Sequence, residues 1–188
     1  MAANPVAHAQ WPELRALGEE WTAVANEARD AAFRIRTADA ERTPEGGGWS
    51  AAQCYVHLSL TTAALLVRLA PALAQEAPPA RRPPRLDFWG RLLCWALDPG
   101  RKFKTKTSAP FQPSPANPWP APVHAFLELH DRAGRLMAQS ANLDLNRIRI
   151  GSPFASALHY NAYSAFRILL VHDRRHQAQA RRAAGALS

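Results

Sequence analysis

Four long stretches of the chain repeat apolar residues every three or four positions, the spacing of an amphipathic helix. They cover about residues 9–37, 50–71, 122–141 and 161–184. Polar and charged residues occupy the remaining positions around each stretch. One side of the first stretch, for example, carries Leu14, Leu17, Trp21, Val24, Ala28, Ala31 and Ile35. The pattern therefore predicts four helices that bury one face each.

The start of the second helix has its own signal. Pro44 and Gly46 to Gly48 interrupt the pattern, and Ser50 followed by Gln53 forms a capping box just before an apolar run. We expect this helix to begin at about Ser50. We expect it to end at Pro71 or slightly beyond, because an interior proline removes a backbone hydrogen bond.

Residues 78–122 contain eleven prolines and separate the second predicted helix from the third. Within this segment, residues 86–97 are apolar enough for a short amphipathic helix but too short to span a bilayer. Residues 143–151 alternate Ile with Arg, which favours a short extended piece before Ser152 and Pro153. We interpret residues 78–122 as an insertion, not as a second domain.

These elements predict an all-α protein. Four helices with one long connection are typical of an antiparallel four-helix bundle, with the Pro-rich crossover between helices two and three. A chain of 188 residues with 47% hydrophobic residues can bury one substantial core. We expect a single domain over residues 1–188.

Charge and composition narrow the choice of partners. The net charge is +8, but the positive residues are mostly Arg and are scattered along the chain, so we expect no specific nucleic-acid partner. The first ten residues have neither a basic start nor a long apolar run, which predicts a cytoplasmic protein. In that compartment Cys54 and Cys94 are expected to be reduced.

The short predicted helix at 86–97 allows two interpretations. Basic residues flank it at positions 81, 82, 85, 101, 102, 104 and 106, a composition typical of a helix lying on a membrane surface. A helix that packs over the core of its own domain has the same sequence pattern. We favour packing, so a membrane partner is not expected.

Three histidines in two distant segments suggest a metal site. His172 and His176 are four residues apart, which places them about 40° apart around a helix, so both imidazoles can point to one ion. His57, in the second predicted helix, would supply a third ligand. Three protein ligands leave a coordination position open for water or substrate, which suits chemistry better than a closed structural site.

The same segments resemble a known family. Trp49-Ser50-x-x-Gln53-x-x-x-His57-Leu58 and His172-Asp-Arg-Arg-His176-x-x-Gln179, together with residues 103–113, are similar to the DinB/YfiT-like superfamily of metal-binding four-helix bundles. The resemblance covers about residues 49–182, and the first helix matches only in type and length.

This resemblance implies a divalent metal held by His57, His172 and His176. Nitrogen ligands favour zinc or nickel, with iron as a further candidate, over magnesium or calcium. Family members with known activity are S-transferases or isomerases that use a low-molecular-weight thiol, so the implied partners are such a thiol and an electrophilic substrate. A metal lowers the pKa of a bound thiol, and the thiolate is the nucleophile. Homodimers are common in the family. A metal-binding or ligand-binding bundle without turnover remains the alternative, and a peripheral membrane protein is a third.

Several neighbouring residues have more than one interpretation. Arg175 lies three residues after His172, and Gln179 lies seven residues after it. Both could contact the ligands or the substrate, although such residues are more often solvated. His130, on the apolar side of the third helix, could approach the metal but is more simply a hydrogen-bonded core histidine. Cys54 could be a redox-sensitive neighbour of the site, but buried cysteine usually behaves as a small hydrophobe.

Overall fold

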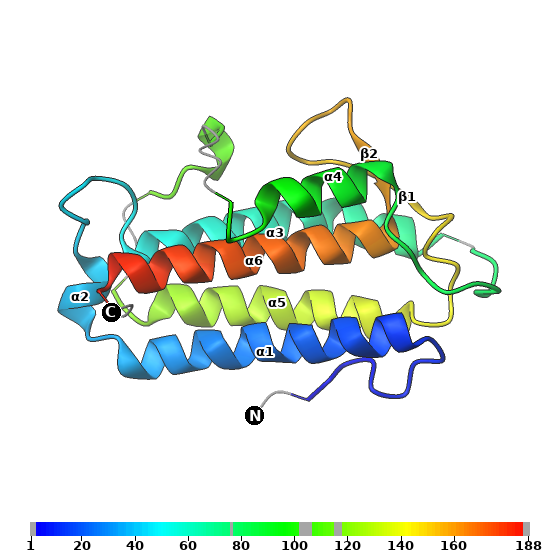
Figure 1. Cartoon of the computed structure of the whole chain (residues 1–188), viewed down its shortest axis with the longest axis horizontal. Helices are drawn as coiled ribbons and strands as arrows, with labels where there is room; N and C mark the ends of the chain where they lie inside the picture. Colours follow the sequence, from blue (N-terminus) through cyan, green and yellow to red (C-terminus); the bar gives the residue numbers. More distant parts are fainter. Residues whose placement is uncertain (1–2, 76, 102–106, 115–117, 186–188) are drawn as a thin grey trace.

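The computed structural model describes residues 3–75, 77–101, 107–114 and 118–185 and is mostly helical, as predicted. Four long helices lie side by side (Figure 1), namely α1 (Pro12–Arg34), α3 (Ala51–Leu73), α5 (Ala121–Gln139) and α6 (Ala162–Ala183). The bounds of the last three fall within a few residues of the predicted ones. The first helix is shorter than predicted, because the chain turns extended at Ile35 and then forms the separate helix α2 (Thr37–Glu41).

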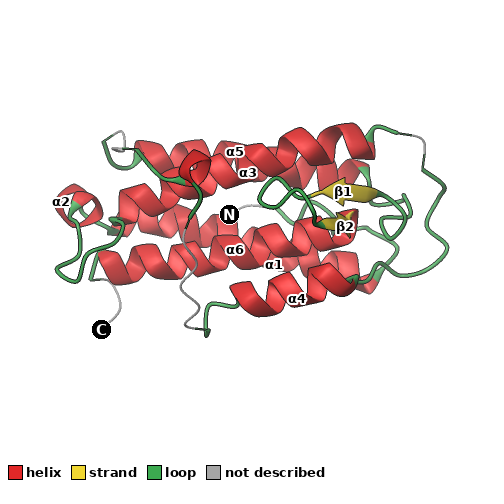
Figure 2. Cartoon of the chain, turned by 90° about the horizontal axis from the view of Figure 1, so that it is seen from above, coloured by secondary structure: helices red, strands yellow, loops and turns green. Residues whose placement is uncertain are grey.

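The directions of the long helices follow from the connection between α3 and α5. α3 packs on α5 and α6, and α1 packs on the same two helices. α1 and α6 run one way along the molecule, while α3 and α5 run the other way (Figures 1 and 2). α1 and α5 therefore run in opposite directions, as do α3 and α6, whereas α3 and α5 run in the same direction. A crossover of 47 residues, from the end of α3 to the start of α5, is what lets the chain return to the end from which α3 began.

Side-chain caps fix where two of these helices begin. The hydroxyl of Ser50 accepts a hydrogen bond from the Gln53 backbone N–H at 3.2 Å, and the Gln53 side chain accepts one from the Ser50 N–H at 3.0 Å. The predicted capping box is therefore confirmed. At α6 the Asn161 side chain accepts from the Ser164 N–H at 2.7 Å. Because each cap fixes the helical register, it also fixes which side chains face the interior.

The connecting segments contain short elements. The crossover holds α4 (Phe88–Leu97), which was predicted, and one 3₁₀ turn, η1 (Ala109–Phe111), which was not. β1 (Arg149–Gly151) coincides with the end of the predicted extended piece, and it pairs antiparallel with β2 (His159–Asn161). β2 was not foreseen, because three residues are too few to show an alternating pattern.

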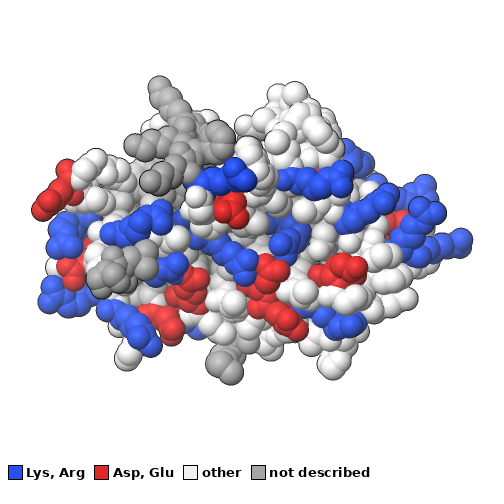
Figure 3. Space-filling view, in the orientation of Figure 1, with Lys and Arg blue, Asp and Glu red and all other residues white. Residues whose placement is uncertain are grey.

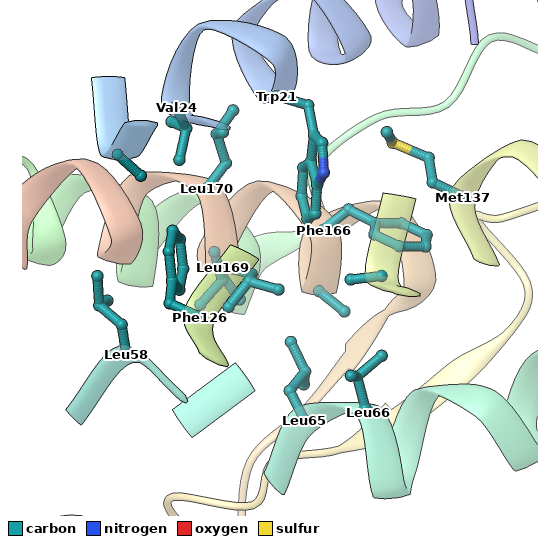
Figure 4. Packing of buried hydrophobic residues seen from close by; sticks show 14 of the residues in the cluster. Trp21, Val24, Leu58, Leu65, Leu66, Phe126, Met137, Phe166, Leu169 and Leu170 are labelled. Carbon is teal, nitrogen blue, oxygen red and sulfur yellow. The ribbon is translucent and has the colours of Figure 1, made fainter. Parts of the chain in front are cut away.

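Apolar side chains from the four long helices form the core (Figure 4). Leu58 and Leu65 on α3 lie opposite Phe126 on α5 and Leu169 on α6, and all four are at most 3% exposed. By length and composition α3 could also cross a membrane, but twelve of its residues are buried inside the protein, which is the pattern of a core helix. His57 therefore belongs to a helix that is held in place along much of its length.

Candidate metal centre

His57 reaches the protein interior from the second turn of α3. Its side chain is 4% exposed, on the same face of α3 as Cys54, Leu58 and Thr61. The capping box begins the helix seven residues earlier and so determines where this imidazole points. His57 faces α6, the helix that carries the other two histidines.

The three predicted histidines come together. One ligand nitrogen from each of His57, His172 and His176 lies within 4.8 Å of the other two. Nε2 of His57 and Nε2 of His172 are 3.3 Å apart. The ring centroids of His172 and His176 are separated by 4.5 Å, as expected for residues one helical turn apart. The sequence separation of 115 residues between His57 and His172 is bridged by the packing of α3 on α6.

Two neighbours determine which ring nitrogens are free. Nδ1 of His57 lies 2.7 Å from the backbone carbonyl oxygen of Phe111, and a carbonyl can only accept, so this Nδ1 carries the proton. Nδ1 of His176 likewise donates to Oε1 of Gln179 at 3.0 Å. In both residues the lone pair is then on Nε2. Contacts of this kind orient metal-binding histidines and raise their basicity.

The geometry fits a tetrahedral metal ion. Two imidazole nitrogens at about 2.0–2.1 Å from such an ion are about 3.3 Å from each other, which matches the separation of the His57 and His172 Nε2 atoms. His176 completes a set of three nitrogen donors, a set typical of zinc, nickel and iron sites. Three donors on two packed helices leave the rest of the coordination sphere to other ligands.

Burial keeps these imidazoles neutral, which is the form that binds a metal. Desolvation lowers the pKa of His57, although its hydrogen bond to Phe111 opposes the shift. Desolvation, reinforced by the neighbouring His176 and His57, lowers the pKa of His172 well below its usual value. The pKa of His176 falls to about 3, again mainly through desolvation and then through the charge of His57.

The lowered pKa of His176 predicts a pH-dependent stability for the metal-free protein. Unfolding returns this histidine to its ordinary pKa of about 6.5, so the unfolded chain binds a proton that the folded chain does not. The free energy of unfolding is then retained above about pH 6.5 and falls as the pH drops toward 3, by up to about 1.4 kcal/mol per pH unit for each such group.

This prediction can be checked by urea denaturation in the presence of a chelator between pH 7 and 4. The slope of stability against pH should be smaller in His176→Ala than in the unmodified protein. Equal slopes would show that His176 is already protonated in the folded protein, and so would contradict its assignment as a neutral donor.

Other residues around the cluster have distinct roles. The ring of Trp49 lies against that of His57, with their centroids 4.7 Å apart, and its centroid is 5.9 Å from that of His176. Trp49 therefore forms an apolar wall beside the three nitrogens.

Arg175 donates to the backbone carbonyls of Asp98 and Arg101, at 3.3 and 3.2 Å. Arg175 therefore holds the end of α4 against α6, and its positive charge lowers the pKa of both His172 and His176.

His130 is a core histidine, the simpler of its two interpretations. Its ring stacks on Trp21 with centroids 4.2 Å apart. Its Nε2 donates to the Trp21 carbonyl at 3.1 Å, and its Nδ1 lies 3.2 Å from an Asp173 carboxylate oxygen. Both ring nitrogens thus have partners in the interior, which leaves none free for a metal and corrects the idea that His130 is an additional ligand.

Cys54 does not have the properties of a reactive thiol. It is fully buried one turn before His57, and burial raises the pKa of its thiol to about 12. A thiol with this pKa is protonated at neutral pH, whereas the thiolate is the reactive form. Cys54 is therefore not expected to act as a nucleophile.

Phe111 was the functional neighbour that sequence reasoning missed. It acts through its backbone carbonyl, which every residue type possesses, so no residue pattern could have identified it. In the sequence, residues 103–113 contribute only to the family resemblance. Gln179 was among the candidates, and its contact with His176 follows from the three-residue spacing on one helix.

Comparison with protein families matches the chain to the DinB superfamily. The family model covers residues 20–180, which include most of α1, the crossover, and all three histidines. Searches of curated proteins and of solved structures found no match.

Proposed function

The chain belongs to the DinB superfamily, and we propose that it is a metal-dependent enzyme of this family that transfers a low-molecular-weight thiol to an electrophilic substrate. The observation that carries the proposal is the cluster of three neutral imidazoles that bring one ring nitrogen each to the same place between α3 and α6. When bound, a divalent ion with three neutral ligands supplies a Lewis acid that lowers the pKa of a thiol or water.

The protein's own residues would hold and orient the reactants. His57, His172 and His176 provide the donors, while the Phe111 carbonyl and the Gln179 side chain keep two of the rings in a productive orientation. Trp49 presents an aromatic face to the site, which supports the binding of apolar parts of a substrate and excludes water from one side. The buried protein thiol Cys54 takes no part.

We further propose that the four long helices constitute one four-helix-bundle domain, with residues 78–122 as an insertion that reaches the site through η1. The side-by-side arrangement of the helices and the extent of the family match support this. The homodimer, the cytoplasmic location and the lack of a specific nucleic-acid partner remain predictions from the sequence.

Gln179→Leu is expected to weaken metal binding about 10- to 100-fold, the usual cost of losing a partner that orients a histidine ligand. Leucine has a similar size but cannot accept the His176 proton. The matched control is Gln179→Glu, which keeps an acceptor and should bind the metal at least as tightly as the unmodified protein. Competition with a chromophoric chelator measures both affinities, and an unchanged affinity in Gln179→Leu would remove this residue from the site.

Thiol binding can be tested on cobalt-substituted protein, because a thiolate ligand adds an intense near-ultraviolet charge-transfer band. Titration with glutathione and with another small thiol should produce this band and, with an activated aryl halide present, consumption of the thiol. His176→Ala should show neither. A metal site that gives no such band with any small thiol would favour the alternative of a bundle that binds a metal without this chemistry.

A further inference from the structure

We infer that α4 and the basic residues around it form a docking surface for anionic membrane lipids. α4 is apolar on two opposite sides, and in the part of the chain that the structure describes one of these sides packs on α6. Gly90, Cys94 and Leu97 recur on the side that faces α6. Contact there is close, because a Cβ atom at Gly90 would overlap with the side chain of Ser164 on α6.

The other side of α4 is a row of large exposed apolar groups. Phe88, Leu92 and Trp95 follow one another at helical spacings of four and three, and they are 64%, 41% and 47% exposed. Trp89 lies beside them at 36% exposed. Most exposed apolar residues of a folded protein occur singly, whereas these four share one short helix. Tryptophan and phenylalanine are also the residues that favour the level of lipid headgroups.

Positive charge is concentrated in the same part of the chain. Residues 81–106 contain eight Lys and Arg and only two acidic residues, so they carry six of the protein's eight net positive charges. All three lysines of the protein are in this segment, at positions 102, 104 and 106. Of the two acidic residues, Asp87 is paired with Arg149 at 2.9 Å.

Charge and apolar surface also meet in space. The guanidinium group of Arg101 lies over the Trp95 ring, 3.9 Å from its centroid. Arg91 on α4 is exposed, and so are Arg81 and Arg82 in the segment that leads to this helix. Figure 3 shows this side of the molecule, where basic side chains spread over α4 and α6 while most acidic side chains lie toward α1. A helix with an aromatic face and flanking Arg and Lys is the composition of an interfacial anchor.

An anionic membrane can bind both the basic residues and the exposed apolar row of this surface. A nucleic-acid duplex would use the charges, but its bases are already stacked on one another and would not cover an exposed Phe–Leu–Trp row. A second copy of the chain would cover the apolar row but would place two segments of like charge against each other, which is unfavourable. Anionic headgroups pair with the basic residues while the lipid interface accepts the aromatic rings. This surface is distinct from the histidine cluster, so the inference does not depend on the proposed function.

Vesicle co-sedimentation of the full chain tests the inference. We expect binding to phosphatidylglycerol–phosphatidylcholine vesicles at low salt, little binding to pure phosphatidylcholine, and a strong loss as salt is raised. Because any basic protein adsorbs to anionic vesicles, the decisive comparison is Leu92→Ser/Trp95→Ser against the control Phe33→Ser, which removes a 91% exposed apolar side chain from α1.

The double variant should lose at least about tenfold in apparent affinity, since it removes two large apolar groups from the interface, and Phe33→Ser should not. Both variants should keep the circular dichroism spectrum and the metal content of the unmodified protein. Equal vesicle binding by the two variants, or no binding at low ionic strength, would overturn the inference. So would a concentration-dependent dimer that only the double variant abolishes, because the row would then be covered by a second copy.

Discussion

His172→Ala is expected to weaken the binding of a divalent metal ion by more than about 100-fold, while the protein remains folded and helical. Loss of a residue that merely orients a ligand costs about 10- to 100-fold, and His172 supplies a donor nitrogen itself. It occupies a central place in the cluster, with its Nε2 3.3 Å from that of His57 and its ring one turn from His176.

The measurement is a competition titration with zinc and with nickel. The matched control is His124→Ala, the same change at an exposed histidine on α5. It should bind metal like the unmodified protein. His57→Ala and His176→Ala should resemble His172→Ala, and a variant of any of the three with unchanged affinity would remove that histidine from the ligand set.

Asp173→Ala is expected to lower the free energy of unfolding of the metal-free protein by about 1–3 kcal/mol, the usual cost of leaving a buried hydrogen-bonding group without its partner. Asp173 is fully buried, and its carboxylate is 3.2 Å from Nδ1 of His130. Because Nε2 of His130 already donates to Trp21, the alanine variant leaves Nδ1 without a partner in the interior.

Asp173→Asn keeps the size of the side chain and a hydrogen bond to His130 but removes the ionisable group. The asparagine amide can donate to Nδ1 of His130, and burial already raises the pKa of Asp173, which favours a protonated, uncharged carboxyl in the native protein. This variant should therefore lose no more than about 1.5 kcal/mol. Asp131→Ala, which removes an exposed carboxylate paired with Arg135 on α5, should cost at most about 1 kcal/mol. Urea denaturation with a chelator present gives all three values, and equal losses in Asp173→Ala and Asp131→Ala would show that the buried pair contributes nothing.

Sequence patterns predicted the four long helices because each has one apolar face, and the start of α3 has a clear capping signal as well. Ser50 and Gln53 located the start of α3, and the structure places both cap hydrogen bonds there. The relative directions of the helices could not be predicted from the sequence. Whether α3 and α5 run parallel depends on where the crossover leads the chain, and a Pro-rich segment of irregular structure has no periodicity that encodes its path.

For the candidate site, too, the sequence predicts some features and only the structure shows the others. His172 and His176 share a helix face through their spacing, so their proximity could be predicted from the sequence alone. The position of His57 beside them depended on the family resemblance, because nothing in local sequence specifies that α3 packs on α6. The role of the Phe111 carbonyl required the tertiary structure. For α4, the sequence could not tell whether the helix packs on the protein or is exposed. In the structure one side of α4 packs on the core, and the opposite side carries large exposed apolar residues.

Elemental analysis of protein purified without a histidine tag shows whether the three histidines hold a metal ion. It should be run beside the His172→Ala/His176→Ala double variant and beside His124→Ala. We expect close to one zinc, nickel or iron ion per chain in the unmodified protein and in His124→Ala, and almost none in the double variant. An unmodified protein that holds no metal even after supplementation, or a double variant with undiminished metal content, would contradict the assignment of His57, His172 and His176 as a metal centre.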